Sequence, residues 1–173
     1  MMQMIDAGGL PALTDNLRAA DESNPRGYLE FEAVKRLQSE KTWLEQGRGH
    51  VVKIIHLLLR ELPTDGTYNY RVILMKRPIK EVLASQRAML DRQGKPSADD
   101  ATLEKIYLSQ LKQVEAWLGA QSTFSFLAME YHDVLTQPRE AAAKINAFLG
   151  GRLNVDAMVQ MVDPTLHHQR SAT

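Results

Sequence analysis

Short runs of mostly apolar residues predict the buried strands of a β-sheet. Three runs stand out, namely Val51–Ile55, Tyr70–Met75 and Phe124–Met129. Each is nearly continuous in apolar character rather than alternating, which is typical of strands covered on both faces. A fourth and weaker run, Leu10–Thr14, is a further strand candidate. We therefore expect a sheet whose two faces are both buried.

Between and after these runs, apolar residues recur at steps of three and four, which predicts helices. Pro78 and Pro138 each stand where a helix should begin, because proline suits the first turn. Ser97, followed three residues later by Asp100, indicates the start of the most regular helix. The predicted helices cover residues 78–93, 97–118, 138–149 and 155–162.

Alternation of strands and helices favours the α/β class. We expect a three-layer domain with a mostly parallel sheet and helices on both faces, formed by residues 1–173 as a single unit. One connection is unusual, because the chain between Val51–Ile55 and Tyr70–Met75 is too short for a long crossover helix.

Composition narrows the function classes. Lys and Arg number 21, equal to the 21 Asp and Glu, so the formal net charge is zero. The chain therefore has no overall positive charge that would attract nucleic acid or an anionic membrane. The chain has no cysteine, which excludes disulfides, thiolate zinc sites and a cysteine nucleophile. Apolar runs fall far short of the roughly 20 residues that span a bilayer. With no targeting signal in the sequence, we expect a cytoplasmic protein without nucleic-acid or membrane partners.

The most specific chemical pattern follows the Tyr70–Met75 run. Arg77 would lie at the carboxyl end of a parallel strand, where open α/β folds bind ligands. Ser85 follows eight residues later, inside the predicted helix. Arginine presents a planar fork of donors to phosphate oxygens, and a serine hydroxyl adds one hydrogen bond. Together the two side chains are suited to hold one phosphate.

The segment from Arg77 to Ser85 reads Arg-Pro-x-x-x-Val-x-Ala-Ser. It is similar to the segment by which sulfotransferases bind the 3′-phosphate of their donor, 3′-phosphoadenosine 5′-phosphosulfate (PAPS). The order of other features agrees with that family along essentially the whole chain: the opening residues 1–9, the Asn-Pro-Arg-Gly turn at 24–27, the run at 51–53, and residues 130–135 before a proline-initiated helix. The chain resembles a bacterial sulfotransferase.

The resemblance implies a P-loop nucleotide-hydrolase type of fold and transfer of a sulfuryl group from PAPS. The acceptor would be a hydroxyl or amine on a small molecule or carbohydrate, and no metal is implied. Family members begin with a strand and a loop of the Pro-Arg-Ser-Gly-Thr-Ser type, which this sequence lacks. We therefore expect the chain to be truncated at its amino end and to begin inside the following helix. Whether it is active is left open.

The resemblance also suggests catalytic candidates. Glu30 follows the Asn-Pro-Arg-Gly turn and is a candidate for accepting the acceptor's proton. Lys53 is a candidate for stabilising charge on the bridging oxygen. His56 is a second candidate base, but Lys53 and His56 are three apart, so the family's Lys-x-His pattern is not matched.

Each candidate also has an ordinary structural interpretation. Arg77 would then form a surface ion pair, and Ser85 would be a small packing residue. Glu30 would be solvated or capping, Lys53 would extend to solvent from a strand end, and His56 would be partly buried with a backbone partner. The adjacent pair His167-His168 suggests metal binding only weakly, because neighbouring side chains point in different directions.

Two other functions stay open at this point. The chain could be a non-catalytic nucleotide-binding or interaction domain, or a fragment of a P-loop kinase. An interaction domain with exposed apolar surface would be expected to form a homo-oligomer. The sequence does not identify the acceptor.

Overall fold

The computed structural model describes residues 1–21, 24–92, 94 and 99–163. Its α-helices and strands follow in the order α1 (Met2–Ala7), β1 (Tyr70–Lys76), α2 (Ile79–Arg92), α3 (Asp100–Ala120), β2 (Phe124–Glu130), α4 (Tyr131–Thr136), α5 (Pro138–Phe148) and α6 (Val155–Gln160). Three short 3₁₀ helices precede β1, namely η1 (Glu32–Arg36), η2 (Thr42–Glu45) and η3 (His56–Glu61). Helices and strands thus alternate as the α/β prediction requires.

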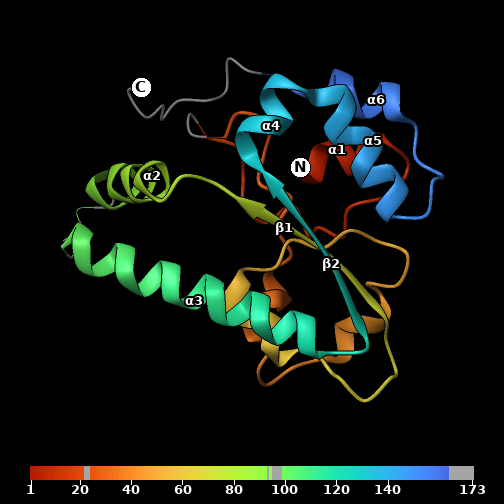
Figure 1. Cartoon of the computed structure of the whole chain (residues 1–173), viewed down its shortest axis with the longest axis horizontal. Coiled ribbons are helices and arrows are strands. Elements are labelled where there is room, and N and C mark those ends of the chain that lie inside the picture. Colours follow the sequence, from red (N-terminus) through yellow and green to blue (C-terminus); the bar gives the residue numbers. More distant parts are fainter. Residues whose placement is uncertain (22–23, 93, 95–98, 164–173) are drawn as a thin grey trace.

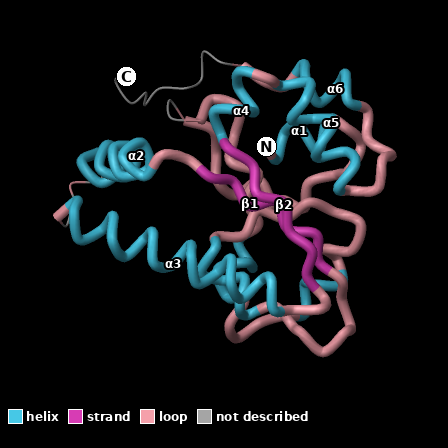
Figure 2. The backbone as a smooth tube through the Cα atoms, viewed as in Figure 1, coloured by secondary structure: helices cyan, strands magenta, loops and turns pink. Residues whose placement is uncertain are grey.

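The two strands pair in parallel along their whole length. The register runs from Tyr70 opposite Phe124 to Lys76 opposite Glu130. The chain between them forms α2 and α3, so the crossover is helical, as parallel strands need. Figures 1 and 2 show the strands side by side, with α3 on one side and α1, α5 and α6 on the other. The predicted parallel α/β arrangement is confirmed.

A separate core packs against each face of this sheet, although Phe126 of β2 stays 37% exposed. Along β1, Tyr70 and Val72 pack against the first core, whereas Ile73 and Met75 pack against the second. This alternation is the period of two that a strand imposes on its side chains. The first core consists of Val34, Leu37, Trp43, Leu44, Leu59, Leu62, Val114, Leu118 and Phe124. The second consists of Met4, Ile5, Met129, Val134, Ala141, Ala142, Ile145 and Met158.

The predicted strand at Val51–Ile55 is wrong as a regular strand, and so is the weaker candidate at Leu10–Thr14. The two segments meet only at an isolated parallel bridge between Ala12 and Val51. After that bridge residues 52–55 belong to no strand, and Ile55, just before η3, is extended and 58% exposed. A short apolar run cannot by itself supply the neighbouring backbone that a strand needs for its hydrogen bonds.

The helix predictions agree better with the structure. α2 follows Pro78, and α5 begins at Pro138 as expected. α3 is capped by Asp99, whose carboxylate accepts a hydrogen bond of 3.0 Å from the Thr102 amide, while the predicted start at Ser97 lies outside the described residues. The short helix α4 was not predicted. In the part of the chain that the structure describes, no helix is long and apolar enough to cross a membrane.

Packing in the second core should contribute strongly to the stability of the fold. Ile145 is fully buried in α5, so Ile145→Ala should lower the free energy of unfolding by roughly 2–5 kcal/mol. Urea denaturation followed by circular dichroism measures this change. Ile106→Ala is the matched control, because Ile106 lies in α3 with 48% of its surface exposed and should change stability far less. Equal losses in the two variants would contradict the assignment of this core.

Candidate functional site

Arg77 lies where the two strands end side by side. It follows Lys76, the last residue of β1, and Tyr131 follows Glu130, the last residue of β2. The Arg77 guanidinium carbon is 4.9 Å from the centre of the Tyr131 ring, a distance that allows a cation–π contact. The Arg77 side chain is 24% exposed. The strand pairing therefore places a partly accessible cation at the carboxyl edge of the sheet, as the sequence predicts.

A carboxylate from α2 also holds Arg77. The Nε–H group of Arg77 donates to Oε2 of Glu81 at 2.8 Å, and Glu81 lies in the first turn of α2. The Glu81 side chain is only 9% exposed. The ordinary interpretation of Arg77 as an ion-pair residue is thus correct in part, but the pair is largely buried rather than on the surface.

Ser85 lies on α2 and is exposed, so it is not a packing residue. Glu81 and Ser85 are four residues apart in α2, a spacing that places them on the same side of the helix, whereas Arg77 precedes the helix and contacts Glu81. The sequence analysis missed Glu81, although its spacing from Arg77 was a usable signal.

Glu30 and Lys53 form an ion pair, as members of a second group of charged side chains. Nζ of Lys53 donates to Oε1 of Glu30 at 2.9 Å, and Arg18 donates from one nitrogen to both Glu30 oxygens at 3.1 and 3.2 Å. Burial alone would raise the pKa of Glu30, but donation from Lys53 and Arg18 outweighs it and holds that pKa below its usual value. Glu30 is therefore ionised at neutral pH and only weakly basic.

Tyr28 extends this group toward a second carboxylate. The Arg18 guanidinium carbon lies 3.4 Å from the centre of the Tyr28 ring, and the Tyr28 hydroxyl donates to Asp21 at 2.7 Å. Burial and the Asp21 carboxylate raise the pKa of Tyr28 more than Arg18 lowers it. Tyr28 thus stays protonated and acts as a donor that holds the loop at Asp21.

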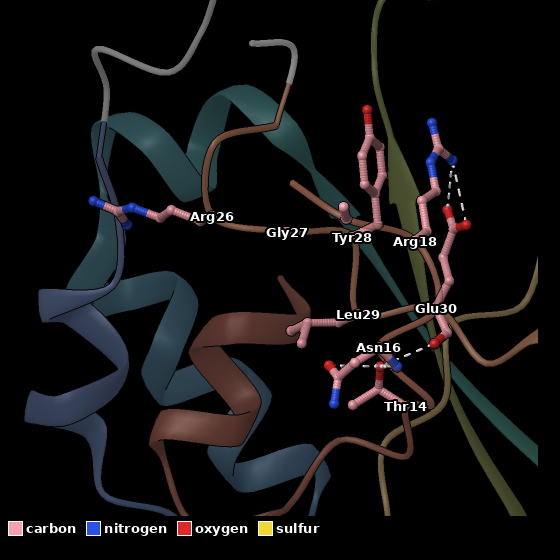
Figure 3. Close-up of a pocket in the computed structure, with 9 residues that line it drawn as sticks. Thr14, Asn16, Arg18, Arg26, Gly27, Tyr28, Leu29 and Glu30 are labelled. Atoms are coloured by element: carbon pink, nitrogen blue, oxygen red, sulfur yellow. Dashed lines mark hydrogen bonds and ion pairs between the residues drawn. The ribbon is translucent and has the colours of Figure 1, made fainter. Parts of the chain in front are cut away.

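A small open cavity of about 200 Å³ lies beside this group (Figure 3). Two of its lining residues, Asn16 and Leu29, have positive φ angles of 56° and 46°. Leucine rarely adopts this left-handed conformation, which costs about 1 kcal/mol or more and is often found at functional sites. The cavity is lined by Thr14, Asn16, Arg18, Ala19, Arg26, Gly27, Tyr28, Leu29 and Glu30.

The predicted turn at residues 24–27 fixes one wall of the cavity. The amide of Gly27 donates to the Asn24 carbonyl at 3.0 Å, which closes the turn. Arg26 donates to the Met161 carbonyl at 2.9 Å and to the Asp163 carboxylate at 2.8 Å. The turn is therefore attached to the segment that follows α6, and in Figure 3 Arg26 points away from Arg18 and Glu30.

His56 has different neighbours. Its Nε2 lies 3.3 Å from the Gln110 side-chain oxygen, and its ring packs edge-on against Tyr107 at 5.2 Å between centroids. Both partners are on α3, so the expected backbone partner is replaced by a side chain. The structure thus joins Glu30 to Lys53 but gives His56 contacts on another element.

The described residues contain no group of three or more His, Asp or Glu side chains arranged to hold a metal ion. The pair His167-His168 lies outside the described residues. The contacts around Arg77 and those around Glu30 form two separate groups. Arg77 pairs with Glu81, four residues later, and contacts the distant Tyr131 ring, whereas Glu30 pairs with Lys53 across 23 positions.

The Glu30 ion pairs should make stability depend on pH. The folded-state pKa of Glu30 lies below the unfolded value near 4.5, so the stabilisation is complete above that value and is lost as the pH falls through the lower one. Glu30→Gln should therefore cost about 1–2 kcal/mol of unfolding free energy at pH 7, and less at pH 3. Thermal or urea unfolding at both pH values measures the difference.

Glu45→Gln is a suitable control for this measurement. The pKa of Glu45 is also lowered, by donation from Arg48, but the Glu45 side chain is 68% exposed, so its pairing is screened by solvent. The quantity to compare is the difference in lost unfolding free energy between pH 7 and pH 3. If this difference is no larger for Glu30→Gln than for Glu45→Gln, the Glu30 pairs have no structural role.

One comparison with known families gave a match. The family model described as a sulfotransferase domain matches residues 28–170. The match includes Glu30, Lys53, Arg77 and Ser85. Neither the curated proteins nor the solved structures gave a match to the chain. Because the family match spans most of the chain, the protein belongs to the sulfotransferase family.

Proposed function

We propose that this protein binds PAPS and supports transfer of its sulfuryl group to a hydroxyl or amine on a small-molecule or carbohydrate acceptor. Family membership supports a sulfonate donor, and it favours this function over a P-loop kinase fragment. The observation that carries the proposal is the position of Arg77, partly exposed at the edge where β1 and β2 both end.

Arg77 and Ser85 would hold the 3′-phosphate of the donor. Arginine suits this role because it stays charged and can offer two parallel donors to phosphate oxygens. The exposed hydroxyl of Ser85 can add a neutral hydrogen bond from α2. These two residues would fix the nucleotide, so that its sulfuryl group is held in one place relative to the acceptor.

Lys53 and Glu30 would act in the transfer itself. The acceptor oxygen or nitrogen forms a bond to sulfur, the bond from sulfur to the 5′-phosphate oxygen breaks, and the electron pair leaves with that oxygen. Glu30 would take the acceptor's proton; a weak base is sufficient if, as in loose phosphoryl transfer, little charge is needed on the nucleophile. Protonation of Glu30 would also neutralise the partner of Lys53, which makes the Lys53 charge available to the leaving oxygen.

The cavity beside Glu30 is the proposed acceptor site. It opens next to the candidate base, and its lining combines hydroxyl, amide, phenol and guanidinium groups. These groups suit an acceptor with several hydroxyls. His56 stays a weaker candidate base, because its contacts are with α3.

Calorimetric titration with 3′-phosphoadenosine 5′-phosphate tests the donor site. Arg77→Ala should weaken binding at least about tenfold, the effect of losing a charge-assisted hydrogen bond to phosphate. Arg71→Ala is the control, since Arg71 is an exposed arginine on the same strand and should leave affinity within about twofold.

One result of this titration would contradict the donor site, and another would contradict catalysis. Equal affinity of the wild type and the Arg77→Ala variant would contradict the donor site. Arg77-dependent binding by a chain that transfers no sulfuryl group to a panel of hydroxyl and amine acceptors would instead favour the non-catalytic nucleotide-binding alternative.

A further inference from the structure

Glu81 is a buried carboxylate whose place in the fold has no explanation in core packing. It is 8% exposed, and among the described residues it is the one charged residue in the buried class. Burying a carboxylate is costly unless a cation and hydrogen bonds compensate it. Arg77 supplies that compensation at 2.8 Å, and the first turn of α2 adds the favourable end of a helix dipole.

Replacing such a pair by apolar residues is often neutral or stabilising, so the pair is poorly explained as a source of stability. It is better explained by what it does to Arg77. A free arginine side chain loses about 2 kcal/mol of rotamer entropy when a ligand immobilises it. A carboxylate that holds the side chain beforehand removes part of this cost from the binding step.

The contacts restrain the guanidinium in two independent ways. The hydrogen bond from Nε–H to Glu81 fixes one direction within the guanidinium plane, because the donor lies in that plane. The Tyr131 ring at 4.9 Å restrains the group from another direction. Phosphate oxygens accept in-plane donors from arginine, so the two restraints together limit the direction from which a phosphate is bound.

We propose that Glu81 is a positioning residue for the donor nucleotide, which acts by orienting Arg77 toward the 3′-phosphate, with Tyr131 as the second restraint. This inference rests on the proposed function, because it assumes that Arg77 binds that phosphate. Glu81 itself does not contact the donor. Its effect should therefore appear in recognition of the 3′-phosphate and not in recognition of the rest of the nucleotide.

The experiment compares two nucleotides that differ only in the 3′-phosphate, 3′-phosphoadenosine 5′-phosphate and adenosine 5′-phosphate. The ratio of their dissociation constants is the 3′-phosphate preference. Loss of fold or of the rest of the site would weaken both nucleotides together, whereas misorientation of Arg77 would lower the ratio. Titration of the full chain with each nucleotide, after circular dichroism has confirmed folding, gives the ratio for every variant.

We expect Glu81→Ala to lower the preference about fivefold or more, and Glu81→Asp to lower it too, because its shorter side chain cannot reach Nε in the same geometry. Glu81→Gln keeps an oxygen acceptor at the same reach and should retain most of the preference. Glu115→Ala is the matched control: Glu115 pairs at 2.6 Å with Lys76, the neighbour of Arg77, and its loss should leave the preference unchanged.

The outcomes separate this inference from the function on which it rests. If Arg77→Ala abolishes the preference while the folded Glu81→Ala and Glu81→Asp variants keep it within about twofold, the positioning role is wrong and the donor site stands. If Arg77→Ala leaves the preference unchanged, the proposed donor site fails and the positioning role fails with it. Should Glu81→Ala not fold, the contrast between Glu81→Asp and Glu81→Gln decides the question alone.

Discussion

The parallel pairing of β1 with β2 is the constraint on which the rest of the structure depends. Because the strands run in the same direction and in full register, their carboxyl ends meet at one edge. The residues that follow, Arg77 and Tyr131, are brought together there although they are 54 positions apart. The strands hold this arrangement because a separate core packs against each face of the sheet. Packing on both faces therefore sets the geometry of the candidate donor site.

The second group of charges is positioned in another way. Glu30 lies in an irregular connection, and its place depends on ion pairs with Arg18 and Lys53 rather than on a strand or helix. The connection is closed by hydrogen bonds such as that from the Thr14 hydroxyl to the Glu30 carbonyl at 2.9 Å. It contains the left-handed Leu29, a conformation that the surrounding contacts must impose. Ion pairs and hydrogen bonds, rather than a helix or strand, thus determine the position of Glu30.

The sequence predicted the regular elements well where nearby residues alone favour the helix or strand. Proline at the first turn and apolar residues at helical spacing placed α2 and α5, and continuous apolar runs placed β1 and β2. The run at Val51–Ile55 has a similar apolar character. It has no neighbouring strand beyond a single bridge to Ala12, however, and therefore does not form a strand. Composition alone does not show which runs will find a partner.

In the candidate site, too, local features were predicted from the sequence and long-range contacts were not. Arg77 and Ser85 were predicted from one local segment, whereas Glu30 and Lys53 were named separately and their contact spans 23 positions. Arg18 was missed because a polar connection has no periodicity that marks one charge among many. Glu81 was missed although it stands four residues after Arg77, because that spacing also describes ordinary exposed ion pairs. Only the burial of Glu81 distinguishes it, and burial follows from the assembled fold.

The central claim is that the edge shared by β1 and β2 holds the 3′-phosphate of the donor. A crystal structure of the chain with 3′-phosphoadenosine 5′-phosphate tests it most directly. The account predicts 3′-phosphate oxygens within about 3 Å of the Arg77 guanidinium and of the Ser85 hydroxyl. A nucleotide whose 3′-phosphate lies elsewhere, such as against Arg18 and Arg26 in the cavity, would contradict it.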